Sequence, residues 1–144
     1  SMYTKLFGLE TITFRYFNVY GERQPIKGQY APVIGIFQKQ SKEGKPLTIV
    51  PDGHQRRDFT HVSDVVEANI LAATKDLQGS YGEIINIGTG ENHSVLEVAS
   101  MLSDKTVFIE PRIGESKETL ADISKAKKIL GWEPKVKLED WIKK

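Results

Sequence analysis

Residues 11–24 read TITFRYFNVYGERQ, and residues 52–59 read DGHQRRDF. The first segment is a β-prone run that ends in Gly21 and is followed by charged residues. Such a run is typical of a buried strand whose end delivers polar side chains to a cleft. The second segment is a glycine-centred turn that places two arginines and an aspartate beside an aromatic residue. Guanidinium groups make charge-assisted, often bidentate hydrogen bonds to phosphate oxygens, so the two segments together predict a phosphate-binding cleft.

In this order and at this spacing, the two segments resemble the extended short-chain dehydrogenase/reductase family, which contains the NAD-dependent nucleotide-sugar epimerases and dehydratases. A third segment, PRIGE at residues 111–115, is similar to the late Arg-x-Gly-Asp/Glu signature of that family. Family members begin with a glycine-rich turn that holds the NAD pyrophosphate, and they use a Tyr and a Lys four residues apart for proton transfer. Here no three glycines have GxxGxxG spacing, and no Tyr is followed four residues later by Lys.

The resemblance therefore implies that residues 1–144 are the carboxyl-terminal, nucleotide-sugar-binding portion of such an enzyme, with the amino-terminal NAD-binding Rossmann domain absent. The expected fold class is α/β. It combines partial Rossmann-type sheet strands, at residues 11–19 and 84–87, with the small α/β substrate-binding domain of the family. The intact enzyme would use NAD to oxidise the sugar at C4 transiently. This chain alone is expected to carry no catalytic residue and not to retain NAD.

Two alternatives stay open. Nucleotide-sugar dehydratases and decarboxylases of the same family carry the same motifs, so the motifs do not identify the sugar chemistry. The second alternative is a stand-alone, non-catalytic binding module. Such a module needs a self-sufficient core and a polar surface where the other domain of the family would sit.

The resemblance also implies roles for individual residues. Phe17 matches the residue that touches the nicotinamide end of NAD, and Asn18 matches the one that bonds the nucleotide-sugar diphosphate. Arg57 and Arg112 match two diphosphate clamps, while Glu115 matches the acid that bonds a ribose hydroxyl. The strand that offers backbone groups to the uracil ring corresponds to Leu47, Thr48, Ile49 and Val50.

Each assignment has a structural alternative. Phe17 and Asn18 have the residue types of a core aromatic and a turn-forming Asn. Arg57 is equally typical of a solvated surface charge or a partner for Asp58, and residues 47–50 of a plain edge strand.

Three neighbouring features are given no binding role. Arg56 is expected to face solvent. His54 has no second His or acid at ligand spacing, so no metal site is predicted. Gly88-Thr89-Gly90 follows a predicted strand, but the third glycine of a phosphate loop would fall at His93, so a tight turn is predicted there.

Composition limits the partners. A net charge of +1, from 20 basic and 19 acidic residues, argues against a general nucleic-acid or membrane surface. The chain has no cysteine, which excludes disulfides and is compatible with a cytoplasmic protein, and no apolar run approaches the roughly 20 residues of a membrane span. The expected partners are a UDP-sugar and the missing NAD-binding domain. Residues 2–20 carry apolar side chains that this domain would cover, so self-association through them is expected.

The hydrophobic pattern and the capping signals predict the remaining elements. Capping boxes are predicted at Asp64 with Glu67 and at Ser94 with Glu97. Helices are predicted at residues 2–9, 32–42, 64–75, from 94 onward, 125–130 and 138–142, and strands at 11–19, 47–50, 59–62, 84–87 and 107–109. Residues 21–30 are predicted to form a loop, and residues 121–134 to be packing elements.

Overall fold

The structure, a computed structural model, describes residues 1–26 and 31–143. It contains the helices α1 (Met2–Phe7), α2 (Val33–Lys42), α3 (Val62–Thr74), α4 (Val95–Ser100) and α5 (Leu138–Ile142), and the π-helical turn η1 (Ala126–Leu130). The strands are β1 (Thr13–Tyr16), β2 (Val19–Tyr20), β3 (Leu47–Ile49), β4 (Arg56–Arg57), β5 (Thr60–His61), β6 (Ile84–Ile87), β7 (His93–Ser94) and β8 (Thr106–Phe108). The class is α/β, as predicted. Residues 27–30 of the predicted loop lie outside the described residues.

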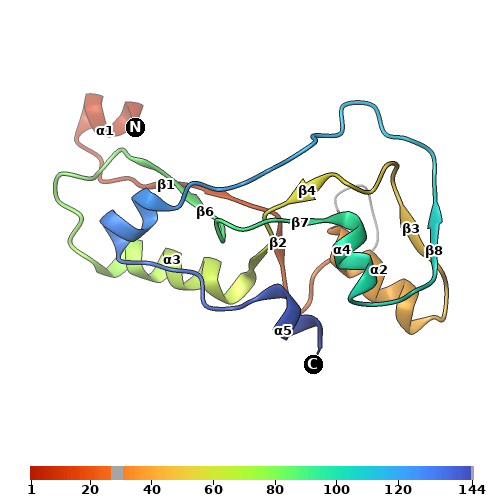
Figure 1. Cartoon of the computed structure of the whole chain (residues 1–144). Helices are drawn as coiled ribbons and strands as arrows, with labels where there is room; N and C mark the ends of the chain where they lie inside the picture. The colour runs from red at the N-terminus through yellow and green to blue at the C-terminus, as the bar shows by residue number, and fades with distance from the viewer. Residues whose placement is uncertain (27–30, 144) are drawn as a thin grey trace.

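The first packed region is built on β1 and β6, which pair in parallel with Thr13 opposite Ile84 and Tyr16 opposite Ile87. Helix α3 and the turn η1 lie against this pair (Figure 1). Their apolar side chains form one core, made of Val65, Ala68, Leu77, Ile85, Ile87, Ala126, Leu130 and Trp132. Three of these residues lie between 121 and 134, so the packing role predicted for that stretch is confirmed.

The second packed region contains α2, α4 and the parallel pair β3–β8, which lie on the other side of the molecule (Figure 1). Its core consists of Tyr20, Ile34, Phe37, Leu47, Ile49, Phe59, Val95, Val98, Ala99 and Leu138. Two short ladders lie between the regions, the parallel pair β2–β5 and the antiparallel pair β4–β7. Neither β4 nor β7 was predicted, because a two-residue strand leaves no periodic pattern in the sequence.

The strand predicted over residues 11–19 is interrupted. Strand β1 ends at Tyr16 and β2 begins at Val19, because Asn18 adopts a positive φ of 30°. Asparagine enters this region of backbone space more readily than most residues. The interruption turns the chain from the first packed region toward the second.

The prediction for the start of α3 was wrong. The helix begins at Val62, and its N-cap is His61, whose ring nitrogen accepts a hydrogen bond from the backbone N–H of Ser63. The carboxylate of Asp64 instead accepts from the backbone N–H groups of Lys135 and Val136, 3.1 Å away in each case. The Asp64 carboxylate is therefore bound by a residue 71 positions downstream in the chain, and a local sequence motif cannot reveal this.

The capping box at Ser94 and Glu97 is confirmed. The Ser94 hydroxyl accepts from the backbone N–H of Glu97, and the Glu97 carboxylate accepts from the backbone N–H of Ser94. Both bonds lie within four consecutive residues, so the sequence alone could specify them.

The amino-terminal side of the molecule is apolar and exposed. Helix α1 buries no residue, and the side chains of Leu6, Phe7 and Leu9 are all more than half exposed. Tyr16 on β1 and Ile70 on α3 are also exposed. A stand-alone module would need a polar surface here. Self-association through residues 2–20 stays a prediction. Among the described residues, no helix is long and apolar enough to cross a membrane.

The carboxylate of Asp58 joins segments that are distant in sequence. The side chain is fully buried and accepts hydrogen bonds from the N–H and hydroxyl of Thr89, the N–H of Gly90 and the N–H of Ala121, at 2.8–3.1 Å. The approach is close at Gly88, where a Cβ atom would lie 2.3 Å from the Ala121 Cβ. These bonds hold the ends of β4 and β6 in fixed relation.

We expect Asp58→Asn to lower the free energy of unfolding by about 2–4 kcal/mol, because its amide N–H₂ would face backbone donors and leave them unsatisfied. Urea denaturation of both proteins measures the difference. The matched control is Asp104→Asn, at an exposed position with no hydrogen bond to a described residue, which should change stability by about 0.5 kcal/mol or less. Equal effects of the two substitutions would contradict the role given to Asp58.

Candidate functional site

A cavity of about 400 Å³ opens beside the second packed region. Among the residues predicted to bind substrate, the structure places six on its lining: Asn18, Thr48, Val50, Arg57, Arg112 and Glu115. These come from four separate parts of the sequence. Their assembly in one cavity agrees with the prediction of a common site, although their contacts with a ligand stay predictions.

Three predicted residues do not line the cavity. Leu47 and Ile49 are fully buried in the second core, because alternate residues of a strand face opposite sides. Phe17 follows β1, where its backbone N–H donates to the carbonyl of Ile87, and its side chain is half-buried.

The backbone of β3 also has two sides. Leu47 and Ile49 make the ladder bonds to β8 and its flanking residues, so the peptide groups of Thr48 and Val50 point away from that strand.

Four backbone groups therefore point outward, namely the N–H and the carbonyl of Thr48 and of Val50. Two of them form hydrogen bonds with side chains. The Thr48 N–H donates to Gln40 Oε1 at 3.1 Å, and the Val50 carbonyl accepts from Gln55 Nε2 at 3.1 Å. The other two groups are the carbonyl of Thr48 and the N–H of Val50. They form a neighbouring acceptor and donor at the cavity edge.

Arg57 lies on β4, and its side chain is only 13% exposed. Nη1 donates to the carbonyl of Arg56 at 2.8 Å, and Nη2 donates to Glu115 Oε1 at 2.7 Å. The structure therefore brings together two predicted ligand-binding residues that lie 58 positions apart.

Residues 109–118, here called the strap, carry Arg112 and Glu115. Figure 1 shows the chain arching away after β8 and returning toward β4. At one end the Ile109 N–H donates to the Ile49 carbonyl, and at the other the Arg56 N–H donates to the Lys117 carbonyl, both at 2.9 Å. All residues of the strap are exposed. The strap thus spans from β3 to β4 and places Arg112 and Glu115 on the cavity lining.

Asn18 is already engaged in this structure. Its Nδ2 group donates to the backbone carbonyl of Asp58 at 3.0 Å and to the hydroxyl of Thr119 at 3.1 Å. A side-chain amide has two N–H donors, so both are used. For Asn18 to donate to a diphosphate, one of these bonds must be exchanged.

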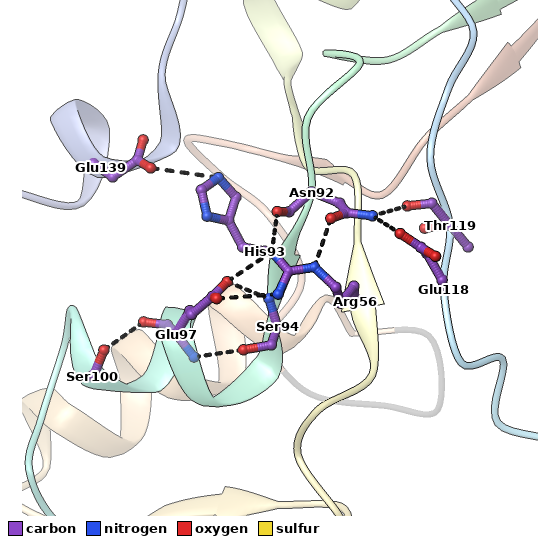
Figure 2. Close-up of polar contacts among 9 residues, drawn as sticks. All are labelled: Arg56, Asn92, His93, Ser94, Glu97, Ser100, Glu118, Thr119 and Glu139. Atoms are coloured by element: carbon purple, nitrogen blue, oxygen red, sulfur yellow. Dashed lines mark hydrogen bonds and ion pairs between the residues drawn. The ribbon is translucent and has the colours of Figure 1, made fainter.

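Arg56 is partly exposed, with 38% of its side chain accessible, but it also forms hydrogen bonds that the prediction of a solvent-facing residue did not include. Figure 2 shows it between Asn92 and Glu97. Its Nε donates to Asn92 Oδ1 at 2.7 Å, its Nη2 donates to the Asn92 carbonyl at 2.7 Å, and its Nη1 lies 3.1 Å from Glu97 Oε1. Consecutive strand residues point to opposite faces, so this anchoring of Arg56 directs Arg57 toward the cavity.

The polar contacts around Arg56 extend to the strap and to α5. Asn92 Nδ2 donates to Glu118 Oε1 at 2.6 Å and to the Thr119 carbonyl at 3.3 Å. His93 Nε2 lies 3.5 Å from Glu139 Oε1 on α5 (Figure 2). The surroundings of β4 are therefore fixed by side chains from three further segments.

The turn at residues 88–90 has a structural role, as predicted. The N–H groups of Thr89 and Gly90 point at the Asp58 carboxylate, which fills the place that a phosphate would need. These residues therefore do not fit a cofactor pyrophosphate. Among the described residues, no group of three His, Cys, Asp or Glu side chains could hold a metal ion.

Several lining residues were not predicted. They are Val19, Ala31, Pro32, Val33, Ile36, Phe37, Gln55, Phe59, Val95 and Ile109. Most are apolar residues whose periodicity indicated core positions, and that signal does not distinguish a core wall from a cavity wall. Gln55 lies in the DGHQRRDF segment, but its polar character alone does not indicate which way its side chain points.

The NAD dependent epimerase/dehydratase family model matches residues 1–88. A UDP-glucuronate 4-epimerase from Thermodesulfobacterium geofontis is 38% identical over 149 residues, which cover 99% of this chain and 44% of that protein.

Solved structures are similar over the same extent. A UDP-glucose 4-epimerase from Thermotoga maritima, solved with UDP-glucose, has a TM-score of 0.90 at 37% identity, over 99% of this chain and 46% of that one. A UDP-glucuronic acid 4-epimerase from Bacillus cereus, solved with UDP-glucuronic acid and NAD, has a TM-score of 0.87 at 38% identity and the same coverage. The chain thus spans about half the length of the relatives it matches.

The carboxyl of Glu97 has a lowered pKa, caused first by the backbone N–H of Ser94 and then by the Arg56 guanidinium. A lowered folded-state pKa stabilises the fold above the unfolded value, about pH 4.3, and this contribution is lost as the pH falls through the folded pKa. We therefore expect Glu97→Gln to be less stable than the parent at neutral pH, and the difference to vanish in acid.

Urea unfolding over a pH series measures this difference. Glu91→Gln is the control, because that exposed carboxylate forms no hydrogen bond or ion pair with a described residue. A stability difference for Glu97→Gln that persists unchanged into acid would rule out the assigned ionic role.

Proposed function

Because the chain belongs to the NAD dependent epimerase/dehydratase family, we propose that it is the nucleotide-sugar-binding portion of a UDP-sugar 4-epimerase, with UDP-glucose as the substrate. The observation that carries the proposal is the cavity itself. Two arginines, an asparagine and an acid from separate segments line it, together with the outward edge of β3. The similar proteins whose structures were solved with UDP-sugars share this fold over the whole chain.

Arg57 and Arg112 would bind the diphosphate. Guanidinium groups match phosphate oxygens in geometry and charge, and the partial burial of Arg57 strengthens such a bond. Asn18 would contribute a neutral donor, because an amide can donate to phosphate without adding charge.

The edge of β3 would bind the base. Uracil presents a carbonyl acceptor next to its ring N–H donor, and the Val50 N–H and Thr48 carbonyl are the complementary pair. Gln40 and Gln55 support this role, since they engage the other two peptide groups and hold the edge in place. Glu115 would accept from a ribose hydroxyl.

The reaction itself requires groups outside this chain. In the family, NAD takes a hydride from the sugar C4 carbon and returns it to the opposite face, while a Tyr and a Lys handle the proton. This sequence has no Tyr-x-x-x-Lys motif, and Asp58 fills the turn at 88–90. Only Phe17 is assigned a cofactor contact. The proposed role of residues 1–144 is therefore to bind and orient the nucleotide-sugar, with an NAD-binding domain as partner.

We expect Arg57→Ala to weaken UDP binding by about 1.5–3 kcal/mol, the usual value of a hydrogen bond to a charged group. The corresponding rise in Kd is about tenfold to a hundredfold, measurable by isothermal titration calorimetry. Arg15→Ala is the matched control, because it removes the same charge from an exposed position on β1 that does not line the cavity. An unchanged Kd for Arg57→Ala would remove Arg57 from the site.

We expect the 144-residue chain by itself to bind UDP weakly, to show no 4-epimerase turnover and to hold no NAD after purification. The reason is that the sequence has neither a Tyr-x-x-x-Lys pair nor glycines at GxxGxxG spacing. Coupled assays with UDP-glucose, and absorbance of the denatured protein for NAD, check both points. Detectable epimerisation would overturn the assignment of catalysis to groups outside the chain.

A further inference from the structure

The ion pair between Arg57 and Glu115 lies inside the proposed substrate cavity. Both side chains line it, and the Nη2 and Oε1 atoms are 2.7 Å apart. The second terminal nitrogen of Arg57 donates to the carbonyl of Arg56. An anion that takes the same Nη2 N–H must displace the Glu115 carboxylate, and an anion that takes the other Nη2 N–H lies beside that negative charge.

Arg112 differs from Arg57 in this respect. It is exposed, and none of the described residues forms an ion pair with it. The cavity therefore has one guanidinium that is open to any phosphate and one that is held by a carboxylate. A phosphate group can bind Arg112 without displacing an ion-pair partner, but it competes with Glu115 for Arg57.

The outcome of that competition depends on what the ligand offers the displaced carboxylate. Inorganic pyrophosphate has no hydroxyl group that the displaced carboxylate could accept from, and its oxygens repel a carboxylate that stays nearby. A nucleoside diphosphate also brings the two ribose hydroxyls, which are donors that a carboxylate can accept. Specificity commonly combines such a repulsive element with an attractive one.

We infer that Glu115 is a specificity-determining residue that excludes inorganic phosphates by occupying Arg57, and yields only to a ligand whose vicinal hydroxyls bind the displaced carboxylate. The inference rests on the proposed function, since it takes the same cavity as the nucleotide site. It adds that Glu115 competes with a ligand's phosphate for Arg57.

The test compares inorganic pyrophosphate with UDP by calorimetry on the intact chain. Glu115→Gln keeps the size of the side chain and removes the charge. We expect it to raise the affinity for pyrophosphate by about two- to fivefold, the range that a partly exposed ion pair supports. The preference for UDP over 2′,3′-dideoxy-UDP should shrink in the same variant.

Two controls separate the ion pair from a general effect of charge. Glu110→Gln removes an acid from the same strap at a position that does not line the cavity, and it should leave pyrophosphate binding unchanged. In an Arg57→Ala background, Glu115→Gln should give a smaller gain, because the contested guanidinium is gone and only the repulsion between carboxylate and anion is relieved.

The outcomes distinguish the two claims. If the parent chain binds UDP but Glu115→Gln gains nothing for pyrophosphate, or gains equally without Arg57, the inference is wrong and the proposed function stands. If the parent chain binds no UDP, the proposed function fails first, and the inference fails with it.

Discussion

The buried carboxylate of Asp58 holds together the parts of the molecule that form the cavity. It accepts hydrogen bonds from the turn after β6 and from the segment that returns after the strap. Asp58 follows β4 directly, so the same contact fixes the position of Arg57. A buried carboxylate is tolerated only when its acceptor sites are satisfied, and here four donors satisfy them. The turn of glycines that could have bound an external anion is thereby used to bind an internal one.

The consecutive residues Arg56, Arg57 and Asp58 make different contacts. A strand sends successive side chains in opposite directions, so Arg56 and Arg57 of β4 face opposite sides. Arg56 is anchored by Asn92 and the carboxylate of Glu97. Arg57 faces the cavity on the other side, and Asp58 is drawn into the interior. One short ladder and the residue after it thus supply an anchor, a cavity-lining arginine and a structural acceptor. A shift of its register by one residue would exchange the two arginines.

Both packed regions leave part of their sheet uncovered. In the second region α2 and α4 pack against β3, whereas all three residues of β8 are exposed, and the cavity lies at its surface. In the first region, β1 and β6 form a sheet of only two strands, and α1 covers none of it. Parallel strands usually lie under helices on both faces. The exposed apolar side chains there have the character of a surface that packs against more protein, and the relatives, about twice as long, are consistent with this.

The sequence by itself determined the α/β class, most of the helices, the Ser94 capping box and the identity of the charged residues of the site. Each of these depends on a pattern within a few consecutive residues, such as an apolar period or a cap. The tertiary structure alone decided what Arg56, Asp64 and Asn18 contact, because their partners are 36 to 101 positions away in the chain. It also decided which residues of β3 face the core and which face the cavity. Arg57 and Glu115 could be named from their motifs, but their ion pair depends on how the strap is anchored at both ends, which no local pattern encodes.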